Sequence, residues 1–186
     1  MQEIILSICL GVGLAAAVGF RVFLPLLVLS LAGHYNIIPL NQSWEWVGST
    51  LSIWVLVIAT LVEIFGYFIP WFDNILDTLA IPLAAVAGTA VMVSTVADLN
   101  PVITWALAII AGGGTAATVK STMGATRLTS TATTGGVANP AVAAVETGTA
   151  AVMSTASIFV APLAIIMLLL LILGFRKIYK KLFAKR

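Results

Sequence analysis

The chain has 186 residues, of which 61% are hydrophobic and only 9% are charged, with a net charge of +2. A soluble domain carries roughly 25% charged residues, so this composition excludes an ordinary water-soluble protein, whose surface it could not cover. We therefore predict an all-α integral membrane protein that forms a single membrane domain over residues 1–186 and is covered mostly by lipid.

Apolar segments of about 20 residues, the length needed to span a bilayer, follow one another along the chain. The first covers about residues 4–32, where Gly19, Arg21 and Pro25 predict a bend or break. Further segments cover about 50–69, 78–97 and 102–119. The stretch "PWFDNILD" (70–77) between two of them is expected to be a turn. Its two aspartates are expected to flank this turn and cap the next helix rather than to bind a divalent cation.

The last apolar run, residues 140–175, is too long for one straight span. A helix of that length would extend roughly 54 Å, against about 30 Å of hydrocarbon. Pro162 and "STAS" (154–157) offer a break, which predicts a fifth helix over about 140–157 and a sixth over about 160–175. Five spans with one kinked C-terminal helix are the alternative.

The charges predict the orientation of these spans. Six of the nine basic residues lie in the tail 176–186, and basic flanks stay in the cytoplasm. Six spans then place both termini there, with the 98–101 turn and the loop after the first span outside. The basic tail can attract anionic lipid. Nucleic acid is not expected as a partner, although assembly into homo-oligomers is compatible with the sequence.

Three short signals recur in the same order in the two halves of the chain. The matches are "GVGLAAAV" (11–18) with "GGGTAATV" (112–119), "VEIFG" (62–66) with "VETG" (145–148), and "IPLA" (81–84) with "APLA" (161–164). They predict two inverted three-helix repeats, over about 1–98 and 99–175, with a transport site near the membrane midplane. The run Gly112, Gly113 and Gly114 predicts either a backbone kink or close helix packing.

Glu63 and Glu146 fall inside predicted spans and are counterparts in the repeat. A charge at the centre of a bilayer costs at least about 2.5–3.5 kcal/mol, so each carboxylate needs a partner, a proton or water. Arg21 and Lys120, each on the first helix of one half, are the candidate partners. The four residues are interpreted either as structural ion pairs or as polar groups along a transport path.

The stretch after the fourth predicted span, residues 120–138, is rich in hydroxyls and is expected to form the inner mouth of the bundle. It ends where Pro140 starts the next helix, whose N-terminus favours an anion. The alternative is an ordinary cytoplasmic loop. The residues predicted to contact an anion or lipid headgroup are Arg127, Ser130, Thr131, Thr133, Thr134, Gly135, Gly136 and Asn139.

No enzyme motif accompanies these features. The single cysteine and single histidine offer no metal cluster, and no nucleophile with a nearby base is evident. We therefore expect no enzyme activity, no cofactor and no metal.

At "PWFDNILDT", "AGGGTAA" and "STATTGGVANPAVAAVE" the sequence resembles domain-of-unknown-function family 4126, a family of small bacterial membrane proteins. The resemblance covers about residues 4–173. It implies a membrane fold in the bacterial inner membrane and carries over no catalytic residues. The plan of two three-helix units with glycine-broken helices is also similar to that of trimeric intracellular cation channels, whose seventh helix this chain lacks.

Three functions are compatible with this reading. The first is a small transporter or channel for an ion or small solute, with its path between the inverted repeats. The second is a protein that binds or translocates a phospholipid or polyprenyl phosphate at Arg127. The third is a structural assembly partner that conducts nothing.

Overall fold

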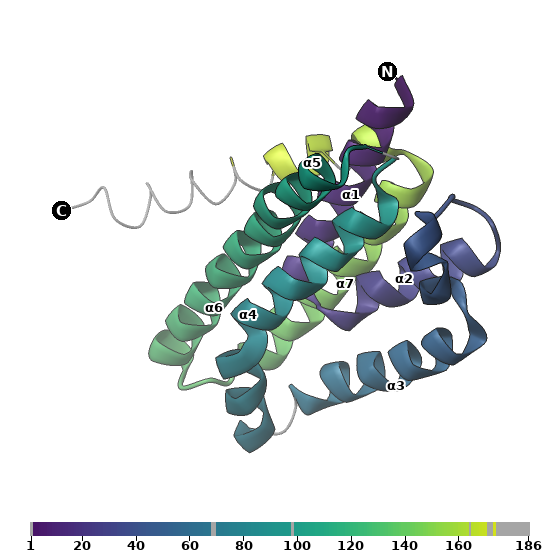
Figure 1. Ribbon diagram of the computed structural model, residues 1–186. Coiled ribbons are helices and arrows are strands. Elements are labelled where there is room, and N and C mark those ends of the chain that lie inside the picture. The colour runs from purple at the N-terminus through teal and green to yellow at the C-terminus, as the bar shows by residue number, and fades with distance from the viewer. Residues whose placement is uncertain (1, 68–69, 98, 164, 171–172, 174–186) are drawn as a thin grey trace.

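All regular secondary structure is helical in the part that the computed structural model describes, which is residues 2–67, 70–97, 99–163, 165–170 and 173 (Figure 1). Residues 161–163 and 165–170 are also helical. The labelled helices are α1 (Gln2–Phe20), α2 (Phe23–His34), the 3-10 helix η1 (Gln42–Gly48), α3 (Thr50–Gly66), α4 (Pro70–Thr95), α5 (Pro101–Leu107), the π-helical turn η2 (Ala108–Gly113), α6 (Gly114–Thr134) and α7 (Asn139–Phe159).

Three helices are long and apolar enough to cross a membrane: α1, the continuous helix over residues 101–134, and α7. The bent pair η1 and α3, with 61° between the two helices, would make a fourth. The prediction of an all-helical fold is therefore confirmed, and the three candidate spans suggest a membrane protein, whereas six spans are not found in the described residues. The basic tail 176–186 lies outside them.

The first apolar segment turns back on itself instead of crossing the bundle once. The break predicted at Arg21 is present, between α1 and α2. The Ser7 hydroxyl accepts from the Ala97 N–H at 3.1 Å, and the Asn41 N–H donates to the Ser94 carbonyl at 2.9 Å. The start of α1 and Asn41, in the loop after α2, therefore both lie beside the C-terminal end of α4. A single crossing by residues 4–32 is thus wrong.

Helix α4 begins at Pro70, eight residues before the predicted start of the third span. The stretch "PWFDNILD" is therefore the first part of a helix and not a turn. Proline suits the first turn of a helix because the N–H that it lacks would have no partner there. The side chains of Asp73 and Asp77, and hence their predicted role as caps, lie outside the described structure.

The fourth span also continues beyond its predicted end. The hydroxyl-rich residues after Lys120 were expected to form a loop, but α6 runs to Thr134. Several of their hydroxyls bond within the helix: Thr122 donates to the Thr118 carbonyl at 2.9 Å and Thr126 to the Thr122 carbonyl at 3.0 Å, whereas the Ser130 hydroxyl is buried without a hydrogen-bond partner. The helix ends at Gly135, whose φ of 63° is left-handed.

The glycine run is a place of close helix packing. A Cβ atom on Gly112 would lie 2.5 Å from the Gly88 carbonyl oxygen of α4, and one on Gly113 would lie 2.5 Å from the Thr89 hydroxyl. Helix α4 can approach η2 this closely only because both positions lack a side chain. The backbone there forms a π-helical turn within a continuous helix.

Replacing Gly112 by alanine should therefore destabilise the protein by about 1–3 kcal/mol, because a methyl group would push α4 away. Thermal unfolding in detergent measures the effect. Gly114 is the matched control, since its nearest contact would be at 3.9 Å; alanine there should be neutral or slightly stabilising. Equal losses from both variants would contradict close packing at Gly112.

The two matched glycine segments run side by side in the same direction. Methyl groups on Gly11 and on Gly112 would both meet Met92 of α4, and a methyl group on Gly19 would meet Val119. Gly11 thus lies level with Gly112, and Gly19 lies level with Val119. Counterparts in an inverted repeat must run in opposite directions, so the predicted inverted architecture does not describe this pair of helices.

Candidate functional site

Arg21 lies at the tip of the α1–α2 hairpin, where the helix break leaves backbone amides without partners. The side-chain carboxylate of Glu63, on α3, is the hydrogen-bond acceptor for these amides. Its Oε1 accepts from the Val22 N–H at 2.8 Å and its Oε2 from the Phe23 N–H at 3.0 Å. The carboxylate therefore caps the N-terminus of α2, which explains its place inside an apolar helix.

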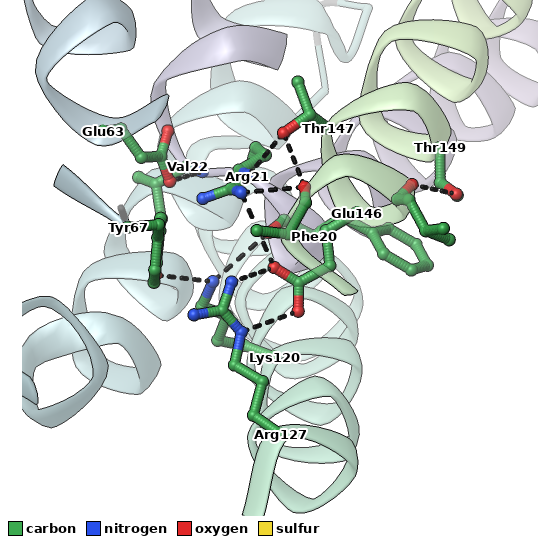
Figure 2. Close-up of polar contacts among 12 residues, drawn as sticks. Phe20, Arg21, Val22, Glu63, Tyr67, Lys120, Arg127, Glu146, Thr147 and Thr149 are labelled. Carbon is green, nitrogen blue, oxygen red and sulfur yellow. Dashed lines mark hydrogen bonds and ion pairs between the residues drawn. The ribbon is translucent and has the colours of Figure 1, made fainter. Parts of the chain in front are cut away.

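Glu146 of α7 pairs with Arg127 of α6 through both of its oxygens, and both side chains are buried (Figure 2). A two-point contact of this kind fixes the geometry of the two helices as well as neutralising the charge. Arg21 approaches the same carboxylate at 3.9 Å. It also donates from Nη2 to the Ala143 carbonyl at 2.9 Å and from Nε to the Thr147 hydroxyl at 3.0 Å.

Tyr67, the residue after α3, contacts three buried cationic side chains, those of Arg21, Arg127 and Lys120. Its ring centroid lies 4.2 Å from Cζ of Arg21 and 3.9 Å from Cζ of Arg127, within the range of cation–π attraction. Its hydroxyl accepts from Nζ of Lys120 at 3.4 Å. Sequence reasoning missed Tyr67 because an aromatic residue at the end of an apolar segment is typical of a membrane-interface anchor.

Lys120 belongs to the buried cluster formed with Arg21, Tyr67, Arg127 and Glu146. It differs from the two arginines because no described carboxylate lies within ion-pair distance of its ammonium group. It is 4% exposed, and its Nζ donates to the Phe20 carbonyl at 3.2 Å and to the Tyr67 hydroxyl, both uncharged. Among the described residues, no carboxylate forms an ion pair with it. The prediction that Lys120 pairs with a glutamate is therefore not what the described contacts show.

A pocket of about 340 Å³ lies beside Lys120, between α4 and α6. Arg127 and Glu146 also line it, and Glu63 does not. The remaining lining residues are small or apolar: Ala80, Ile81, Ser121, Met123, Gly124, Ala125 and Leu128. The site thus joins buried positive charge to an apolar wall, which suits a molecule that carries an anionic group.

A family described as "Domain of unknown function (DUF4126)" matches residues 8–181. The chain belongs to this family. No curated protein and no solved structure matches it, so the expected similarity to trimeric intracellular cation channels stays a prediction. The family description assigns no activity, and the function of this DUF4126 protein must be argued from the site itself.

The hydroxyl stretch of this DUF4126 protein lies away from the buried cluster. Thr131 accepts from the Asn139 amide at 3.0 Å, and Thr134 accepts from the Ala138 N–H at 3.2 Å. These bonds close the turn between α6 and α7, and most of the stretch is exposed. The structure therefore separates Arg127, which is buried with Glu146, from the other residues predicted to contact an anion: Ser130, Thr131, Thr133, Thr134, Gly135, Gly136 and Asn139.

Proposed function

We propose that this DUF4126 protein is a membrane transporter for an anionic molecule, which binds in the pocket beside Lys120. The observation that carries the proposal is the buried ammonium group of Lys120, whose hydrogen-bond partners are both uncharged. A buried charge is costly unless an opposite charge compensates it. An anion in the adjoining pocket would supply that compensation.

The engagement of Glu63 and Glu146, the two buried carboxylates among the described side chains, supports an anion over a cation as cargo. Glu63 is occupied by two backbone amides, and Glu146 by Arg127. A metal ion or proton would have to displace these partners to reach either oxygen pair. An anion, by contrast, would add a partner to Lys120 without breaking a described contact.

The proposal keeps the bacterial inner membrane as the location and the tail 176–186 in the cytoplasm, as its basic residues predict. Lipid is the surrounding solvent, and no chemical conversion of the cargo is invoked. On this view Arg21 and Glu63 hold the hairpin tip in place, and Lys120 and Arg127 face the cargo.

Reconstituted liposomes test the proposal with a panel of soluble anions, soluble cations and a headgroup-labelled anionic lipid. We expect at least one anionic molecule to cross faster than in empty liposomes, and Lys120→Met to slow this movement at least about tenfold. Thr118→Met, at an exposed position of α6 that does not line the pocket, is the control. Movement of cations alone, of nothing at all, or of anions at an unchanged rate in Lys120→Met would each refute the proposal.

A further inference from the structure

We infer that the anionic group held by this pocket is the phosphate headgroup of a membrane lipid, which enters sideways from the bilayer between α4 and α6. The inference rests on the proposed function and specifies its cargo. Three features of the described residues support it: the direction in which the pocket opens, its depth in the membrane, and the polarity of its walls.

The pocket opens on the outer face of the bundle. Ile81 of α4 is 45% exposed and Leu128 of α6 is 74% exposed, and both line the pocket. Ser121 and Ala125, one helical turn apart on α6, also line the pocket and are exposed. In a membrane protein the apolar side chains on such a face contact lipid tails, so the opening faces the bilayer.

The depth of Lys120 matches that of a headgroup. The continuous helix over residues 101–134 starts beside the polar turn at Asn100. Counting along it from Pro101, Lys120 lies roughly 28 Å and Arg127 roughly 39 Å from its start. The hydrocarbon core is about 30 Å thick. The two cations therefore lie near the opposite interface, at the level of lipid phosphates rather than at the midplane.

The walls suit an amphiphile. Lys120 and Arg127 mark the inner, buried end of the pocket, whereas Ile81, Ala125 and Leu128 form its rim. A phosphate at the inner end would leave the acyl chains beside the exposed Ile81 side chain and in the bilayer. Basic pockets between transmembrane helices bind lipid headgroups in this way. A small soluble anion would make no use of the rim.

A substitution at Gly124 can block the entry of lipid into the pocket without altering a charged residue. It lines the pocket, and a Cβ atom added to it would meet nothing within 4 Å. A leucine at this position would therefore fill the pocket and leave Lys120 and Arg127 unchanged. Gly148 of α7 is equally open but does not line the pocket, so Gly148→Leu is a matched control.

The experiment measures binding to the full-length protein in detergent by native mass spectrometry, with three probes. These are phosphatidylglycerol, diacylglycerol, which lacks the phosphate, and glycerol 3-phosphate, which lacks the tails. We expect phosphatidylglycerol to bind at least about tenfold more tightly than either of the others, which corresponds to about 1.4 kcal/mol. Gly124→Leu should lose this binding, and Gly148→Leu should retain it.

The outcomes distinguish the inference from the proposed function. Tight binding of glycerol 3-phosphate that Gly124→Leu does not affect would overturn lateral lipid entry but leave an anion site intact. Equal binding of diacylglycerol would show that tails alone are recognised, which also overturns the inference. Failure of all three probes, together with no anion movement in liposomes, would remove the proposed function itself.

Discussion

Replacing Glu146 by alanine should destabilise the protein by about 3–5 kcal/mol, the largest loss expected from any single substitution in the site. Arg127 would remain buried and lose the carboxylate that it contacts at two points, and Arg21 would lose its nearby negative charge. Removing one partner of a buried ion pair is strongly destabilising because the other charge is left behind.

Equilibrium unfolding in detergent measures this loss, and Glu3→Ala is the control. Glu3 is an exposed carboxylate in the first turn of α1, and its removal should change stability by less than about 0.5 kcal/mol. Glu146→Gln should be intermediate, because the amide oxygen can still accept one hydrogen bond from Arg127. A Glu146→Ala variant as stable as Glu3→Ala would show that the pair does not hold α6 to α7.

Replacing Lys120 by methionine should have the opposite effect on stability and abolish function. Replacing buried ionic groups by apolar side chains of similar volume often stabilises by about 1–4 kcal/mol. The lost hydrogen bonds to the Phe20 carbonyl and the Tyr67 hydroxyl together offset about 2 kcal/mol of that gain. We therefore expect a variant that unfolds at higher temperature than the parent but no longer binds or moves an anion.

The combination of higher stability with lost anion binding distinguishes a functional lysine from a structural one. If Lys120 held the bundle together, Lys120→Met would lower both stability and binding. If it served neither purpose, stability would rise while binding stayed unchanged. Thr118→Met, on the same helix but away from the pocket, should leave both quantities near the parent values. Binding residues often reduce stability because, without the ligand, their charge or hydrogen-bonding groups lack a partner.

Composition and charge alone predicted the helical membrane fold, since both are summed over the whole chain. The break at Arg21 was also predictable, because glycine, arginine and proline interrupt the apolar run locally. The reversal of direction there was not. It depends on contacts of Ser7 and Asn41 with the end of α4, which are distant in sequence and leave no local pattern.

The candidate site was also predictable only in part: its charged residues could be selected from the sequence, but their contacts could not. Buried charges in apolar segments are rare, so Arg21, Glu63, Lys120 and Glu146 could be selected from the sequence. Their partners could not be assigned, because pairing depends on which helices lie together. The hydroxyl stretch was misjudged for a different reason: threonine has a low helix propensity, but in α6 several threonine hydroxyls bond to a carbonyl one turn earlier.

The hairpin tip places a condition on the order of assembly during synthesis. The Val22 and Phe23 amides bond to Glu63, which is synthesised about forty residues later. Arg21 bonds to Ala143 and Thr147, at sequence separations of 122 and 126 residues. These contacts of Arg21 can form only after α7 has been synthesised. The earliest segment to be made is therefore among the last to reach its final position.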